Sequence, residues 1–340
     1  MMKGIINNRW ILLLFLLILC FGLNLSLGSV RIPFSEIFNI LIGKNSSEPV
    51  WKNIVWDFRM TKALTCILAG SGLSLAGLLM QTLFRNALAG PDVLGLSSGA
   101  SLAVSLVILG RAAGFQLLSS PSPWTVVLAA SAGCGAVFMI VMAIARQLRD
   151  DTSLLIVGLM IGATAASLVS VLQFISNADD QQIFLIWTFG SLGGLNWTEI
   201  LILAATLLLG TGVALALLKP LNAWVLGDNY TSSMGLNIRR ARTLIIFAAC
   251  LLTGAVTAFC GPIAFVGLAV PHLTRLLFKT HEQSTLIPAV VVNGAVLMLI
   301  CDILAQLPGS AYVLPINAIT ALIGAPVVIS IIMQSKRVAI

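Results

Sequence analysis

The chain has 340 residues, of which 59% are hydrophobic and only 9% charged, and its mean hydropathy is +1.04. Soluble domains carry about 25% charged residues, so this composition excludes an ordinary water-soluble protein. A transmembrane β-barrel is also excluded, because its strands would alternate polar and apolar residues in short segments. The sequence therefore predicts an all-helical, multi-pass membrane protein in one transmembrane domain over residues 1–340.

Ten apolar segments are long enough to be considered as membrane spans. They lie at residues 10–28, 54–84, 93–110, 123–146, 152–175, 198–218, 242–260, 262–279, 285–306 and 314–334. No small-residue cleavage site follows the first segment, so we interpret it as an uncleaved span. The third segment is short and the eighth begins at Gly261-Pro262, so both are candidates for broken or tilted helices.

The positions of the basic residues predict the orientation. With the N-terminus in the cytoplasm, thirteen of the nineteen Lys and Arg residues fall on the inner side and six on the outer side. Cytoplasmic loops of membrane proteins carry such an excess of Lys and Arg. The distribution places both termini inside, and it accounts for the net charge of +7 without nucleic acid as a partner.

The second predicted span contains two rows of small residues. Thr65, Ala69, Gly72 and Ala76 form one row, and Gly70, Ser74 and Gly77 form the other. Small residues let helix backbones approach closely in lipid, where the hydrophobic effect does not drive association. We expect this helix to be central in the bundle.

Chemistry-bearing residues are sparse in the predicted spans. All six cysteines lie in apolar segments without a C-x-x-C pair, so we interpret them as packing residues. His272 and His281 have no partner at metal-ligand spacing, and no metal site is predicted. The lack of a mid-membrane carboxylate argues against an ion-coupled secondary transporter, which stays as an alternative. The chain has no phosphate-binding G-x-x-x-x-G-K-[ST] loop, so any ATP would be bound by another polypeptide.

One polar interruption, NAWVLGDNYTSSMGLNIRRAR at residues 222–242, lies between the sixth and seventh spans on the predicted cytoplasmic side. It combines apolar side chains with glycines and with Asn, Ser and Thr, which can cap short helices. A solvated loop would not need Trp, Val and Leu together. We interpret residues 220–241 as a cytoplasmic docking segment, with a plain connecting loop as the alternative.

Four motifs together resemble those of the FecCD family of ABC-importer permeases. They are NALAGPDVLGLSSGASLA at 86–103, WTFGSL at 187–192, GPIAFVGLAVPHLTRLL at 261–277 and LPINAITALIGAPVVISII at 314–332. The four occur in the family's order and extend from the end of the second span to the last. The Gly-Pro pairs in two of them mark turns or helix breaks, which need not contact a substrate.

The resemblance implies a fold like that of the cobalamin-importer permeases, with about ten transmembrane helices. It implies a bacterial cytoplasmic-membrane protein that forms a translocation path with a second permease subunit. Two copies of a cytoplasmic ATPase and an extracellular or periplasmic siderophore-binding protein would complete the importer. The cargo would be an iron–siderophore complex, with haem or cobalamin as alternatives. The chain itself would be neither an enzyme nor the carrier of a cofactor, because ATP and Mg²⁺ would bind the ATPase.

The resemblance also implies roles for individual residues. The segment 220–241 would contain two coupling helices that contact the ATPase through Leu226, Gly227, Asp228, Ser232, Met234, Gly235 and Leu236. Arg59 and Lys62 would dock the binding protein, although snorkelling at the membrane interface is an alternative. Thr152 and Ser153 would form a cytoplasmic gate, although both are also ordinary helix-starting residues.

Two family positions for docking charges differ in this chain. Gln306 occupies the place of a common Arg, and Val313 that of a common Glu. A docking charge is therefore missing, which favours a heterodimer of two related permeases over a homodimer.

Overall fold

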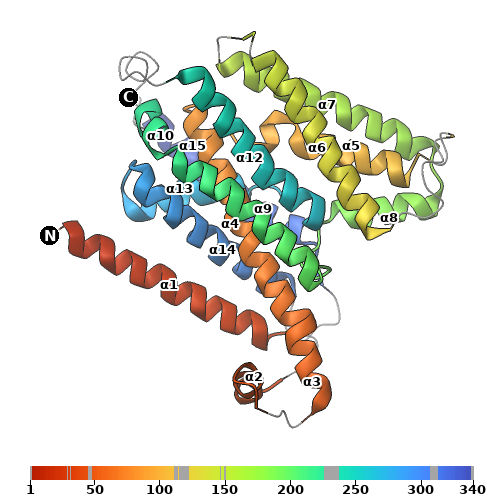
Figure 1. Ribbon diagram of the computed structural model, residues 1–340, viewed down its shortest axis with the longest axis vertical. Coiled ribbons are helices and arrows are strands. Elements are labelled where there is room, and N and C mark those ends of the chain that lie inside the picture. Colours follow the sequence, from red (N-terminus) through yellow and green to blue (C-terminus); the bar gives the residue numbers. More distant parts are fainter. Residues whose placement is uncertain are drawn as a thin grey trace.

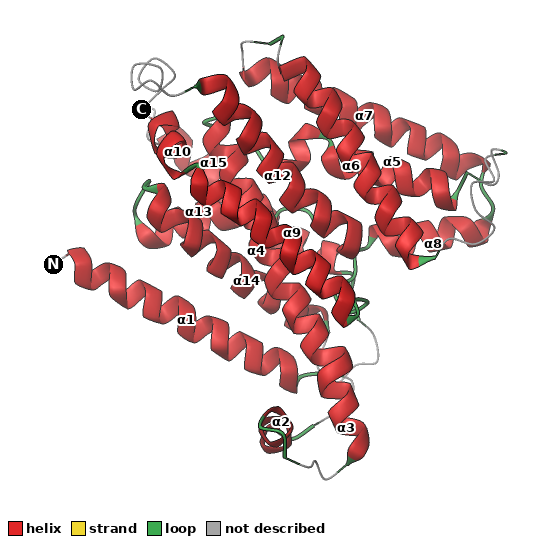
Figure 2. Ribbon diagram, viewed as in Figure 1, coloured by secondary structure: helices red, strands yellow, loops and turns green. Residues whose placement is uncertain are grey.

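The computed structural model describes residues 2–28, 30, 32–44, 48–110, 114, 122–145, 147–148, 151–225, 237–306 and 313–337. Every regular element in these residues is a helix, as Figure 2 shows. The all-helical prediction is therefore confirmed for the described part of the chain.

The helices pack side by side as a bundle (Figure 1). They are α1 (Met2–Ser26), α2 (Phe34–Leu41), α3 (Pro49–Asn53), the π-helix η1 (Ile54–Met60), α4 (Thr61–Leu83), the 3₁₀ helix η2 (Pro91–Leu94), α5 (Leu96–Ile108), α6 (Pro123–Ala145), α7 (Asp151–Ile175), α8 (Ala178–Thr188), α9 (Trp197–Ala216), α10 (Leu218–Val225), α12 (Ile238–Cys260), α13 (Val266–Phe278), α14 (Gln283–Ala305) and α15 (Ile316–Arg337).

Each predicted span corresponds to a helix. Among the described residues, seven helical stretches are long and apolar enough to cross a membrane. Three shorter apolar helices, Leu96–Ile108, Val266–Phe278 and Ile316–Ser330, occupy the third, eighth and tenth predicted spans. Because these three helices are shorter, it stays a prediction that they also cross the membrane and bring the total to ten spans.

The sequence-based bounds need correction at three places. The second span begins as the π-helix η1 and continues as α4. The third is interrupted at Gly95, which adopts a left-handed φ of 75° between η2 and α5. The eighth does not begin at Pro262, because Phe265 has φ 67° and the helix starts at Val266. The short helices α2, α8 and α10 were not predicted, since none is long enough to register as an apolar span.

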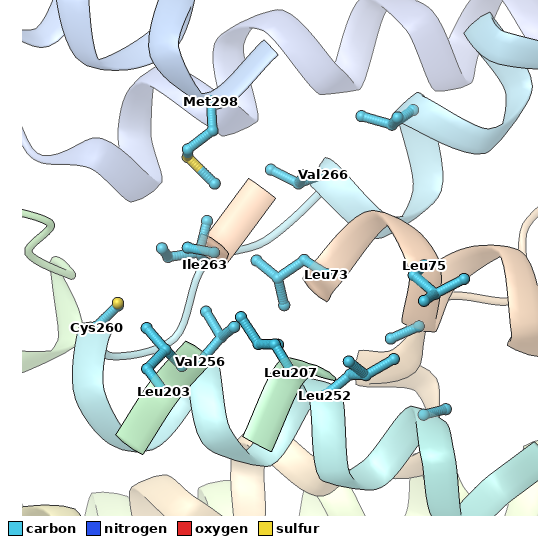
Figure 3. Close-up of a cluster of buried hydrophobic side chains, with 14 of the residues drawn as sticks. Leu73, Leu75, Leu203, Leu207, Leu252, Val256, Cys260, Ile263, Val266 and Met298 are labelled. Carbon is cyan, nitrogen blue, oxygen red and sulfur yellow. The ribbon is translucent and has the colours of Figure 1, made fainter. Parts of the chain in front are cut away.

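α4 is the centre of the bundle, where it packs against α14, α12, α13 and α9. Its stretch Pro49–Leu83 has the most buried apolar window of the seven long stretches, 78%, against 17% for Ser153–Ile175 of α7. The predicted central position is confirmed. Figure 3 shows Leu73 of α4 beside Leu207 of α9 and Val256 of α12, with Val266 and Met298 nearby.

The small-residue rows of α4 are contact sites between helix backbones. A Cβ added to Gly70 would lie 2.2 Å from the carbonyl oxygen of Gly294 in α14. A Cβ added to Gly77 would lie only 1.8 Å from the carbonyl oxygen of Gly267 in α13. The absence of a side chain at these positions therefore sets the distance between the central helices.

Candidate functional site

The motif segments 187–192 and 261–277 meet at two glycines with positive φ. Gly190 has φ 74° and Gly261 has φ 76°. Ser191 N donates to the carbonyl of Cys260 at 2.8 Å. A Cβ on Gly261 would lie 2.7 Å from the carbonyl oxygen of Trp187, so this turn leaves no room for a side chain. The junction joins the end of α8 to the end of α12.

Asn317, in the motif segment 314–332, connects α15 to the same junction. Its side-chain Oδ1 accepts from Ala264 N at 3.1 Å, and its backbone N donates to Phe189 O at 3.3 Å. Non-helical backbone within a membrane protein is tolerated where such bonds satisfy it. Three motif segments far apart in the sequence thus form one hydrogen-bonded junction.

The fourth motif segment, 86–103, lies against α13 and α7. A Cβ on Gly267 would lie 2.9 Å from Cδ of Pro91, which explains a glycine in α13 opposite the Gly-Pro turn. Gly95 approaches the backbone of Gly158 and Gly162 in α7, each 3.0 Å from its added Cβ. These contacts fix how α13 packs on η2 and how α7 packs on η2 and α5.

A polar group that we call the Lys62 cluster lies where α4 and α14 meet at one end of the bundle. It consists of Lys62, Asp302, Asn24 and Gln306. Lys62 Nζ lies 2.9 Å from Asp302 Oδ1, while Asn24 Nδ2 and Gln306 Nε2 each donate to Asp302 Oδ2 at 2.7 Å. Asp302 is 2% exposed, so these partners replace the water that a buried carboxylate loses. The cluster ties α1, α4 and α14 together.

Arg59 lies beside the Lys62 cluster and is largely buried. Its Nη1 donates to Leu25 O at 2.6 Å and to Ser26 O at 3.0 Å, and its Nη2 donates to Val30 O. The guanidinium therefore holds carbonyls at and beyond the C-terminal end of α1. The structure places Arg59 and Lys62 together around a cavity of 210 Å³, and their role in docking stays a prediction.

α7 presents a row of exposed hydroxyl groups. Thr164, Ser167 and Ser170 are three residues apart, and each donates to a carbonyl of its own helix at 2.9–3.0 Å. Thr152 and Ser153 lie in the first turn of the same helix, and Ser153 is half-buried. The predicted gate residues and the exposed row therefore share one helix, and the gate itself stays a prediction.

The opposite end of α4 is joined to α10 through Trp224. This side chain is 1% exposed, and its Nε1 donates to Leu83 O at 3.0 Å. Arg85 Nε donates in return to Trp224 O at 3.1 Å. Asn222 Oδ1 accepts from Gln283 N at the start of α14 at 2.9 Å. α10 is thereby attached to both central helices.

The predicted coupling residues begin directly after α10. Leu226, Gly227, Asp228, Ser232, Met234, Gly235 and Leu236 lie outside the described residues, so their arrangement stays a prediction. The flanking parts of segment 220–241 are helical, since α10 ends at Val225 and α12 begins at Ile238.

Several residues of these sites were missed by the sequence analysis. Asn24 looks like an ordinary residue of the first span, because its partner Asp302 lies 278 residues away. Trp224 looks like an apolar contact residue, because its partner Leu83 lies 141 residues away. A polar Asn within an otherwise apolar first span was the available signal. All six cysteines are free and buried, as predicted. Among the described residues, no group of three or more His, Cys, Asp or Glu could hold a metal ion.

A bundle of apolar helices around close-packed glycines, with polar groups at both ends, is the architecture of a multi-pass membrane protein. Comparisons with known proteins narrow this class to a transport permease. The profile of the FecCD transport family matches residues 16–334. The hemin transport system permease HmuU of Yersinia pestis is 32% identical over 99% of both chains. The vitamin B12 import system permease BtuC of Shigella boydii is 30% identical over 97% of both.

A solved structure described as a "metal-chelate type ABC transporter" in an inward-facing conformation superposes with a TM-score of 0.82 at 27% identity. The match covers 95% of this chain and 97% of the solved one. The chain belongs to the FecCD transport family. It is a multi-pass permease of an ABC importer in the bacterial cytoplasmic membrane.

Proposed function

We propose that the chain is the membrane-spanning subunit of an ATP-driven importer for an iron–siderophore complex. An external binding protein delivers the complex, two cytoplasmic ATPases drive its passage, and the path lies between this chain and a second, related permease. Both termini lie in the cytoplasm, so the Lys62 cluster is at the outer end of α4 and Arg85 at the inner end. The observation that carries the proposal is the exposed, uncharged and hydroxyl-bearing face of α7.

This face of α7 suits a path for a large chelate. Thr164, Ser167 and Ser170 offer hydroxyl groups, and Phe174 on the same side is 89% exposed. A surface of small hydroxyl and apolar groups gives no strong binding site that would trap the cargo. A second permease subunit facing it would enclose the path and cover an apolar helix that this chain leaves exposed.

The attachment of α10 supports coupling through residues 226–236. A force applied to this segment by the ATPase passes to α10, and through Trp224 and Asn222 to α4 and α14. These two helices meet again at the Lys62 cluster, where the binding protein docks in our proposal. The route is a series of packed helices with direct hydrogen bonds at both ends.

Uptake by proteoliposomes tests the cargo and the energy source together. They would contain this chain with its partner permease, ATPase and binding protein. We expect ATP-dependent uptake of a ferric siderophore and little uptake of haemin or cyanocobalamin. Haemin or cobalamin uptake would identify one of the alternative cargoes, which the similarity to HmuU and BtuC supports. Uptake by this chain alone with an ion gradient would instead identify a secondary transporter.

The coupling segment gives a direct prediction. We expect Gly227→Leu combined with Gly235→Leu to abolish ATP-driven uptake, because bulky side chains would obstruct the contact with the ATPase, while membrane insertion stays normal. Gly212→Leu is the control, since no atom lies within 4 Å of an added Cβ there. Normal uptake by the double variant would refute the coupling role.

Docking gives a second prediction. Reversing Arg59 and Lys62 to Glu should reduce uptake at least about tenfold when the binding protein is limiting. The reason is that two cations proposed to meet acidic residues of the binding protein are replaced by anions, which those acids repel. Lys52→Glu is the control for a charge reversal at an exposed position nearby. Because Arg59 and Lys62 also bond within the chain, the melting temperature is measured in parallel. Unchanged uptake by a stable variant would contradict docking at these residues.

A further inference from the structure

The short helix α2 lies just beyond the end of α1, and the proposed transport path does not use it. It has a defined start and end. Pro33 precedes it, and Gly43, with a left-handed φ of 81°, follows it. Gly43 N donates to Ile40 O at 3.1 Å and Lys44 N donates to Asn39 O at 2.9 Å, which is the hydrogen-bond pattern of a glycine-terminated helix. α2 is therefore a complete helix within the connection between α1 and α3.

Apolar residues cover more than the buried side of α2. Ile37 and Ile40 are each 2% exposed and belong to the hydrophobic core. Phe34 and Phe38, four residues apart, are 63% and 58% exposed, and Leu41, three residues further on, is 38% exposed. Residues at this spacing share one side of a helix. Phe34, Phe38 and Leu41 thus form an exposed apolar stripe, which we call the Phe38 stripe, beside the side that faces the core.

The polar residues of α2 lie away from the Phe38 stripe. They are Ser35, Glu36 and Asn39, and at about 3.6 residues per turn they occupy the sector opposite it. The helix therefore has three sides, of which one faces the core, one is apolar and exposed, and one is polar. A helix that lies in a membrane surface has this pattern, because its apolar side meets acyl chains while its polar side meets water.

The contact between α2 and α1 places the Phe38 stripe at membrane depth. The apolar stretch Asn8–Ser26 of α1 is long enough to cross a membrane. A Cβ added to Gly22, about one turn before the end of α1, would lie 3.7 Å from Cε2 of Phe34. The stripe thus begins beside the last turn of α1, where Leu23 is 41% exposed. Figure 1 shows α2 nearly end-on and α1 from the side, so α2 runs across the direction of α1, as a helix parallel to the membrane surface would.

Arg59 holds the connection between α1 and α2. Its guanidinium donates to Leu25 O and Ser26 O at the end of α1 and to Val30 O in the connection itself. Hydrogen bonds from a charged donor are among the stronger ones. α2 is therefore kept next to the end of α1, and its exposed side keeps one orientation.

We propose that α2 lies in the surface of the outer leaflet, with the Phe38 stripe buried among phospholipid acyl chains. Helices of this kind lie with their apolar side about 5–10 Å into the boundary between headgroups and acyl chains. The stripe is covered by lipid and not by the external binding protein, because it continues the exposed apolar side of α1. The choice of the outer leaflet rests on the proposed orientation. α2 would hold the outer end of α1 at a fixed depth beside the Lys62 cluster.

Spin-label accessibility tests the proposal on the full chain in lipid nanodiscs, in which both membrane faces are open to solutes. Phe38→Cys and Ser35→Cys are each labelled with a nitroxide, and both positions are exposed in the protein. Oxygen concentrates in the bilayer, whereas a charged nickel chelate stays in water. We expect the ratio of oxygen to nickel relaxation to be at least about fivefold higher at position 38 than at position 35. The unaltered chain is the background control, since its six cysteines are buried.

Leu41→Cys, on the same stripe, provides a second variant if Phe38→Cys does not fold. Equal ratios at positions 38 and 35 would overturn the proposal. So would a label at position 38 that the nickel chelate reaches until added binding protein protects it, because the stripe would then be a protein-docking surface. The measurement needs neither cargo nor ATPase, so it can fail while the proposed import function stands.

Discussion

Gly77→Ala is expected to destabilise the permease severely. Its new methyl group would lie 1.8 Å from the carbonyl oxygen of Gly267, 2.5 Å from the carbonyl carbon and 2.6 Å from Cα. All three are backbone atoms, so no side-chain rotation can relieve the overlap and α4 must move away from α13. Overpacking in a core costs about 1–3 kcal/mol, and we expect the upper end of that range or more.

Thermal unfolding of the detergent-solubilised protein measures this effect. A loss of about 3 kcal/mol corresponds to a fall in melting temperature of roughly 4 °C in a chain of this size. Gly135→Ala is the matched control, because it makes the same change within helix α6 and meets no atom within 4 Å. If Gly77→Ala melted within about 2 °C of Gly135→Ala, the close approach of α4 and α13 would be wrong.

The central position of α4 could be predicted because lipid leaves helices few ways to associate. Gly70, Ser74 and Gly77 recur at a spacing that places them on one side of a helix, and such a row has little use except close packing. The partners could not be predicted. That Gly70 meets Gly294 while Gly77 meets Gly267 depends on how α13 and α14 cross α4, and short-range sequence patterns do not contain this information.

The candidate site was predictable where its residues form motifs and unpredictable where they pair over a distance. Gly190 and Gly261 stood in recognisable segments, but their contact with each other required the fold. The position of Lys62 in the sequence indicates a cation at the outer end of its span, but its pairing with Asp302, 240 residues further along the chain, is visible only in the fold. Hydropathy treats an ion pair as two isolated charges, whereas a bundle can bring them together and remove both from water.

This pairing leads to the second large effect. Asp302→Asn should lower the free energy of unfolding by about 3 kcal/mol. Breaking a buried ion pair costs about 3–5 kcal/mol because one charge stays without a partner. We expect the lower end, since the Lys62 side chain is 20% exposed and retains some contact with solvent. The amide oxygen can still accept from Asn24 and Gln306, but its NH₂ group would then face the ammonium of Lys62.

Adding Lys62→Met to the Asp302→Asn variant should recover more than half of the lost stability, because it removes the unpaired ammonium that would otherwise face the NH₂ group of the new amide at position 302. A double-mutant cycle of Lys62→Met and Asp302→Asn measures this coupling from melting temperatures. Strictly additive losses would show that the pair contributes no coupling. The double variant also separates the two proposed roles of Lys62. If it is stable but takes up cargo poorly at limiting binding protein, then the ammonium of Lys62 acts in docking as well as in joining α4 to α14.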